Sequence, residues 1–150
     1  MRTGRRLAFD YGDVRIGVAV SDPDGIFASP REHVINDEHL VKSLEFLISE
    51  TEPIYLVVGL PLHLHGGASA KSKAVQSFAA QLRAITPLEI FFVDERLSTV
   101  SAAKSLRDSG KNARESKGLI DSAAAAGILE SALLSEKSQG VPSRLTYEDK

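Results

Sequence analysis

Four acidic residues, at three places in this chain, lie where carboxylates could carry chemistry. Asp10 lies near the end of the apolar run LAFD, Asp94 and Glu95 directly follow the apolar run IFFV, and Asp121 interrupts the apolar stretch GLIDSAAAAGIL. Carboxylates that converge repel one another, and burying them unpaired is costly, so such a group makes sense if a cation joins it. Ligand sets made only of oxygen favour Mg²⁺ or Mn²⁺, and a pair of such ions suits phosphoryl chemistry.

Each acid also has an ordinary structural interpretation. Asp10 could accept amide hydrogens within its own turn. Asp94 and Glu95 could lie in a solvated loop that pairs with Arg96, and Asp121 could cap a helix that begins at Ser122. The residues taken one at a time leave both interpretations open.

The first third of the chain is typical of an antiparallel meander. Two β-rich runs, residues 6–11 and 14–20, are separated by Gly12-Asp13, a pair that closes tight hairpins. A turn at Asp22–Gly25 leads into a third run at 26–35, in which Pro30 predicts an edge strand.

The hydrophobic period then changes from strand to helix. Leucines and isoleucines at helical spacing predict a helix over 37–51, with Asn36 and Asp37 as candidate caps. Two short apolar runs, 54–58 and 89–93, flank a second amphipathic helix, and a helical crossover makes such strands parallel. Further helices are predicted over 98–109 and from after Gly110 to about Leu134.

These elements predict an α/β fold with a five-stranded mixed sheet, three strands antiparallel and two parallel, flanked by helices. With 150 residues, the chain is the size of one ordinary domain. We expect one domain over residues 1–135 and a polar, flexible tail over 136–150. Ligands of open α/β sheets bind outside the carboxyl ends of the strands, so Asp10 and the pair Asp94-Glu95 are expected in one crevice if their strands lie near each other.

Charge is distributed unevenly along the chain. Residues 96–117 contain six basic and two acidic residues, a balance of +4, whereas the formal charge of the whole chain is -2. A basic surface near the carboxylates would bind the phosphate backbone of a nucleic acid. Alternatively, these basic residues lie on a solvated helix face and form ordinary ion pairs. The candidate phosphate contacts in this run include Arg96, Lys104 and Arg107, and Lys71, near the start of the second helix, is another.

The composition indicates a soluble protein without thiol chemistry. The chain has no cysteine and no apolar run long enough to span a membrane. We therefore expect a cytoplasmic location and no membrane partner.

Four motifs in order resemble the YqgF/RuvX family, which has an RNase H-like fold related to the RuvC resolvases. They are FDYGDVRIGVAVSD at 9–22, VVGLP at 57–61, VDERLSTVSA at 93–102 and IDSAAAAGILES at 120–131. The resemblance spans residues 7–134 and implies a metal-dependent nuclease that matures the 5′ end of the small-subunit (16S) ribosomal RNA precursor; Holliday junction cutting is the alternative.

The resemblance also implies roles for individual residues. Asp10, Glu95 and Asp121 would be the catalytic acids and the ligands of two Mg²⁺ or Mn²⁺ ions. Arg15 and Arg96 would contact phosphate or hold the carboxylates. Two departures from the family pattern concern substrate contact: Val14 stands where a basic residue is usual, and Gly66-Gly67 where Asp-Gly is common.

Three other functions compete with the processing nuclease. A resolvase needs a two-fold dimer to cut opposing strands, whereas we expect a monomer or weak homodimer. An ATP-binding domain of the actin type also opens on an Asp-x-Gly hairpin, but needs two such lobes. A nucleic-acid-binding module without catalysis is disfavoured by the three intact acids.

Overall fold

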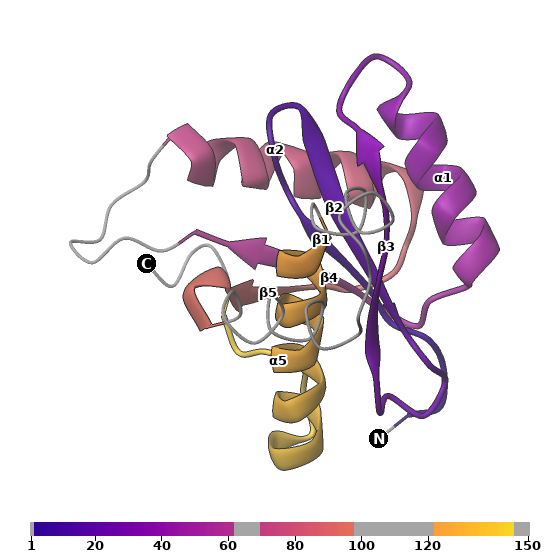
Figure 1. Ribbon diagram of the computed structural model, residues 1–150, viewed down its shortest axis with the longest axis vertical. Helices are drawn as coiled ribbons and strands as arrows, with labels where there is room; N and C mark the ends of the chain where they lie inside the picture. Colours follow the sequence, from indigo (N-terminus) through magenta and orange to yellow (C-terminus); the bar gives the residue numbers. More distant parts are fainter. Residues whose placement is uncertain (1, 62–69, 98–121, 146–150) are drawn as a thin grey trace, which may run out of the picture.

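The computed structural model describes residues 2–61, 70–97 and 122–145 (Figure 1). Its described elements are five strands, three α-helices and a short 3₁₀ helix. In chain order they are β1 (Leu7–Asp10), β2 (Arg15–Ser21), β3 (Ala28–Ile35), α1 (Leu40–Thr51), β4 (Leu56–Leu60), α2 (Ala70–Ile85), β5 (Ile90–Asp94), η1 (Glu95–Leu97) and α5 (Ala123–Gln139).

The strands form one mixed sheet in the order β3-β2-β1-β4-β5. β1 pairs antiparallel with β2, and β2 with β3, as the two turns predict. β4 pairs parallel with both β1 and β5. The five-stranded α/β prediction is therefore confirmed, and the carboxyl ends of β1, β4 and β5 lie at the same edge of the sheet.

The two faces of the sheet are covered by different helices. Alternate strand residues such as Leu7, Phe9 and Val58 pack with α1 and α2 in one core cluster. The residues between them, such as Ala8 and Val57, pack with α5 in a second cluster. Figure 1 shows α5, in orange to yellow, lying across the sheet. Because side chains alternate along a strand, Asp10 and Gly59 belong to the face that α5 covers.

The edge position predicted for the third strand from Pro30 is confirmed, since β3 has only β2 as a neighbour. Opposite Gly17 the register between β2 and β3 shifts by one residue, between the pairs Ile16↔Val34 and Val18↔Arg31. The first hairpin is looser than the two-residue turn predicted at Gly12-Asp13. Its β1–β2 ladder ends at Asp10↔Gly17, and residues 11–14 separate the two strands.

The predicted helix caps at Asn36 and Asp37 are wrong. α1 begins at Leu40 with His39 as its N-cap residue, and no side chain caps it. Asp37 instead accepts a hydrogen bond from the His39 amide over 2.9 Å, an Asx-type turn that precedes the helix. The two polar residues therefore organise the loop rather than the helix end.

The end predicted for the last helix, about Leu134, is also wrong, because α5 continues to Gln139 and ends at Gly140, whose φ is 82°. Glu136 is buried, and Leu145 forms a β-bridge with Phe92 of β5. Residues 136–145 thus contact the sheet. The division into a domain of residues 1–135 and a flexible tail stays a prediction, although its boundary falls inside α5.

Candidate active site

Asp10 is the last residue of β1 and lies on the α5 face of the sheet, half-buried. Burial and the negative charge of Glu95 raise the pKa of its carboxyl to about 6, although the Lys71 ammonium acts to lower it. The fold therefore holds Asp10 where its charged form is unfavourable without a nearby cation. Asp10 and Glu95, 85 positions apart in the chain, interact electrostatically, as predicted from their strand ends.

Glu95 follows β5 directly, as the first residue of η1, and is paired with a lysine of α2. The Lys71 ammonium donates to its Oε1 over 3.2 Å. The side chains are 49% and 26% exposed, so water screens this ion pair only in part. Lys71, predicted as a substrate contact, here serves as a positive partner of a candidate metal ligand.

Asp94 and Arg96 form a separate ion pair beside the site. The guanidinium donates through Nε and Nη2 to both carboxylate oxygens of Asp94, with Nη2 2.8 Å from Oδ2, and holds the pKa of that carboxyl below its usual range. Asp94 thus shows the ordinary structural interpretation, an ion pair with Arg96, whereas the roles predicted for Arg96 toward phosphate or the metal-binding carboxylates stay predictions. Asp94 is thereby oriented by Arg96, whereas Glu95 is the acid whose charge acts on Asp10.

Two small residues that the sequence analysis did not single out position this edge of the sheet. A Cβ on Gly59 of β4 would lie 2.4 Å from Cδ1 of Ile128 and 3.4 Å from Cβ of Glu95. Glycine therefore lets α5 and η1 approach β4 closely. Ser122, at the start of α5, accepts a hydrogen bond from the Val18 amide over 2.9 Å and fixes that helix start on β2. The sequence signal for this close approach was the glycine within the apolar run VVGLP; we find no comparable signal for Ser122.

Asn36, the residue after β3, holds the loop that follows Asp10. Asn36 donates through Nδ2 to the Gly12 carbonyl over 2.9 Å and to the Tyr11 hydroxyl over 3.1 Å. Its backbone amide donates to the Val14 carbonyl. The Tyr11 ring packs on Phe78 of α2 at a centroid distance of 5.3 Å. These contacts fix the chain immediately after the catalytic candidate.

The remaining predicted site residues are only partly covered by the described part of the chain. Arg15, the first residue of β2, is exposed. Asp121, Lys104 and Arg107 lie outside the described residues, as does the helix predicted over 98–109. Within the described residues no three histidine, cysteine or acidic side chains gather around one point.

The donor chemistry of the described acids fits a hard divalent cation. Asp10 and Glu95 offer only carboxylate oxygens, the ligands that Mg²⁺ and Mn²⁺ prefer. The pKa of Asp10 is raised by the neighbouring negative charge, so a bound cation would relieve a repulsion already built into the fold. The two residues are suited to hold a metal together, with Asp121 as the predicted third ligand.

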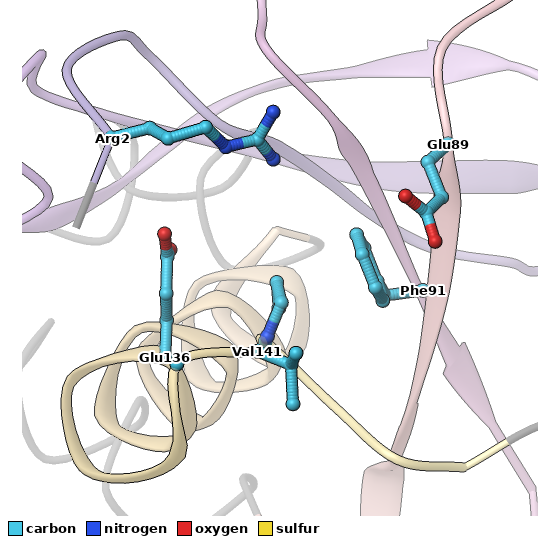
Figure 2. Close-up of a pocket in the computed structure, with 7 residues that line it drawn as sticks. Arg2, Glu89, Phe91, Glu136 and Val141 are labelled. Carbon is cyan, nitrogen blue, oxygen red and sulfur yellow. The ribbon is translucent and has the colours of Figure 1, made fainter.

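A pocket of about 550 Å³ lies at the opposite end of the parallel strands. Figure 2 shows Arg2, Glu89 and Glu136 directing their charged groups toward the same space, beside Phe91 and Val141. Glu136 accepts hydrogen bonds there from the Tyr55 hydroxyl (2.6 Å) and Arg6 Nη2 (3.2 Å). This pocket contains none of the predicted site residues, so the carboxylate pair defines the candidate active site.

Comparison with known proteins agrees with this geometry. The family model described as "RuvX: Holliday junction resolvase" matches residues 4–135. A relative from Streptomyces coelicolor, provisionally named a pre-16S rRNA nuclease, is 46% identical, and the match covers 95% of this chain and 87% of the relative. A relative from Mycolicibacterium smegmatis with the same name is 47% identical, and the match covers 85% of this chain and 78% of the relative.

The solved structures support the fold. RuvC of T. thermophilus, in complex with a Holliday junction substrate, superposes with a TM-score of 0.60 over 91% of this chain and 97% of its own, at 13% identity. At such low identity, the superposition shows that the two chains share a fold. The RNase H-like architecture expected from the motifs is thereby confirmed. From the family match over nearly its whole length and from its relatives, this chain belongs to the RuvX family.

Proposed function

We propose that this protein is a metal-dependent nuclease that matures the 5′ end of the small-subunit ribosomal RNA precursor. Membership of the RuvX family makes it a hydrolase of phosphodiester bonds. The observation that supports the metal dependence is the coupling of Asp10 to Glu95 at the carboxyl ends of β1 and β5, where burial and the negative charge of Glu95 raise the pKa of Asp10. A cation bound between the two carboxylates would stabilise the ionised form of Asp10.

In this proposal Asp10, Glu95 and Asp121 hold Mg²⁺ or Mn²⁺, with two ions as the expected number. Bound metal would supply activation of water and stabilisation of the leaving oxygen. Asp10 is the central ligand, since it lies on β1 between the strands that carry the other parts of the site. Ser122, fixed to β2 through the Val18 amide, directly follows Asp121 in the chain and supports its assignment as the third ligand.

The basic residues around the carboxylates are proposed to bind the phosphate backbone of the substrate. Arg15 lies exposed at the start of β2, at the same end of the sheet as Asp10, and is proposed as a phosphate contact. Arg96 orients Asp94, and Lys104 and Arg107 are proposed to contact phosphate from the basic run. The relatives named for ribosomal RNA favour RNA as the substrate. We also propose that the enzyme is cytoplasmic and acts as a monomer or weak homodimer.

A Holliday junction resolvase is the second candidate, favoured by the likeness to RuvC bound to a junction. It would share the same carboxylates but require two copies of the chain related by a two-fold axis, so that both strands are cut. The two candidates therefore differ in substrate and in oligomeric state.

The test is a cleavage assay with the wild type, Asp10→Asn and the control Asp13→Asn, which removes an exposed carboxylate three residues away. Each is assayed in Mg²⁺, Mn²⁺ or EDTA on a labelled ribosomal RNA precursor fragment and on a four-way DNA junction. We expect metal-dependent cutting of the RNA, lost by at least about a hundredfold in Asp10→Asn and kept in Asp13→Asn.

The other outcomes each overturn a part of the proposal. Cutting of the junction alone, together with a dimer in sedimentation analysis, would establish the resolvase. Binding without cutting would establish a nucleic-acid-binding module. Undiminished cutting by Asp10→Asn would reject the site itself.

A further inference from the structure

Lys71 is the described cation closest to the candidate metal ligands. It projects from the first turn of α2 (Ala70–Ile85), and its Nζ lies 3.2 Å from Oε1 of Glu95. Its positive charge also lowers the pKa of Asp10, which Glu95 raises. One ammonium thus compensates both carboxylates.

An ammonium and a divalent metal ion would compete for these oxygens. Both cations interact with the same lone pairs, and two positive charges placed a few ångströms apart repel strongly. The Lys71 side chain is 49% exposed and has a flexible four-carbon stem. It can therefore leave Glu95 for solvent without any change in the core.

From this geometry we propose that Lys71 is an exchangeable counter-ion: it neutralises Glu95 and Asp10 while the site lacks metal, and metal binding displaces it. The displaced ammonium is then available, next to the site, for an oxygen of the substrate phosphate. The inference rests on the proposed function, because it takes Glu95 and Asp10 as metal ligands.

The position of Lys71 on its helix supplies a matched control. Lys73 is exposed and lies two residues further along α2, and residues two apart do not share a helix face. Lys73→Met removes the same charge from the same turn of helix without touching the pair with Glu95. Glu95→Gln removes the acceptor and keeps the shape of the side chain.

The experiment measures Mn²⁺ binding to the full chain by isothermal titration calorimetry, without nucleic acid, in the wild type, Lys71→Met, Lys73→Met and Glu95→Gln. Circular dichroism confirms that each variant is folded. If Lys71 competes with the metal, Lys71→Met should bind Mn²⁺ about three- to fivefold more tightly than the wild type, the factor expected for losing a partly exposed ion pair. Lys73→Met should match the wild type, and Glu95→Gln should bind at least about tenfold more weakly.

Two results would overturn the inference, and they are distinguishable. Unchanged or weaker Mn²⁺ binding in Lys71→Met, with binding still lost in Glu95→Gln, would show that Lys71 helps or ignores the metal, and the proposed function would stand. Mn²⁺ binding that Glu95→Gln leaves unchanged would remove the metal site itself, and with it both the inference and the proposed mechanism. Equal tightening in Lys71→Met and Lys73→Met would assign the effect to overall charge and would also reject the exchange.

Discussion

The charge of Asp10, the proposed central metal ligand, has a cost in stability. Its pKa is raised to about 6 in the folded protein, from 3.8 in the absence of the fold, by burial and by Glu95. The folded state therefore binds this proton more tightly than the unfolded state, and the ionised carboxylate destabilises the fold. The cost is complete above about pH 6 and absent below about pH 4.

Asp10→Asn should for this reason be more stable than the wild type in metal-free buffer at pH 8, by up to about 3 kcal/mol. The magnitude follows from the rise of the Asp10 pKa from 3.8 to about 6, because each tenfold change in proton affinity corresponds to about 1.4 kcal/mol. The difference should shrink as the pH falls through 6 and disappear near 4. Urea unfolding in EDTA at several pH values measures it.

The exposed Asp13 supplies the control for this experiment. Asp13→Asn removes a carboxylate that is already solvated, so its free energy of unfolding should stay within about 0.5 kcal/mol of the wild type. A stability gain in Asp10→Asn that does not vary between pH 4 and 8 would contradict the burial of that charge.

At the scale of elements, Gly59 determines how closely α5 and η1 approach β4. Gly59→Ala would place a methyl group 2.4 Å from Cδ1 of the fully buried Ile128. The resulting overpacking should destabilise the fold by about 1–2 kcal/mol. It should also lower the cleavage rate, because the new methyl group would also lie 3.4 Å from Cβ of Glu95.

A double-mutant cycle separates this contact from a general loss of stability. Ile128→Val deletes the methyl group that the alanine would meet, at a cost of about 1 kcal/mol on its own. Gly59→Ala should then cost clearly less in the Ile128→Val background than in the wild type. Strict additivity of the two losses, measured by chemical denaturation, would show that Ile128 is not what the alanine meets.

The elements themselves were largely predictable, because local signals specify them. Turn residues and alternation predicted the meander, Pro30 its edge strand, and the helical crossover the parallel pair of β4 and β5. The pairing of β1 with β4 was not predictable, since nothing local to Leu7 or Leu56 records which strand lies beside it. The strand ends nevertheless led to Asp10 and Glu95, whose electrostatic coupling needs only that their strands share an edge.

Contacts made by single side chains across the fold escaped prediction. Lys71 pairs with a residue 24 positions away, and Asn36 has the composition of a cap but holds the loop after Asp10. Glu136 stands in a polar stretch with the character of a tail, although its partner Arg6 lies 130 positions earlier. Such pairs depend on how α2, α5 and the loops pack around the sheet, which the sequence pattern alone does not specify.

At the scale of the whole molecule, the Arg6–Glu136 pair ties the two ends of the described chain together. The Arg6 side chain is fully buried and donates to Glu136 and to the carbonyls of Gly4, Arg2 and Pro23. Its guanidinium lies 5.7 Å from the centroid of the Tyr55 ring. Burial and the Glu136 carboxylate raise the pKa of the Tyr55 hydroxyl, which therefore stays protonated and donates.

Glu136→Ala should lower the free energy of unfolding by about 3 kcal/mol, because it leaves a buried guanidinium without its carboxylate. Its neighbour Lys137 is exposed, and Lys137→Ala should change stability by less than about 0.5 kcal/mol. Thermal unfolding of both variants makes the comparison.

Truncation tests the same contact and the predicted boundary together. A chain that ends at residue 135 should be destabilised at least as much as Glu136→Ala, whereas one that ends at residue 145 keeps every contact described here. Equal stability of the two truncated chains would mean that residues 136–145 are dispensable and that the domain does end at 135.

No helix in the described part of the chain is long and apolar enough to cross a membrane.

The face of the sheet formed by Ala8, Ala19 and Val57 is covered by α5, which follows every strand of the sheet in the chain. During translation that apolar face stays exposed after β5 has left the ribosome, because domains complete their packing only when their last element is available. The nascent chain therefore cannot bury this face of the sheet until α5 has been synthesised.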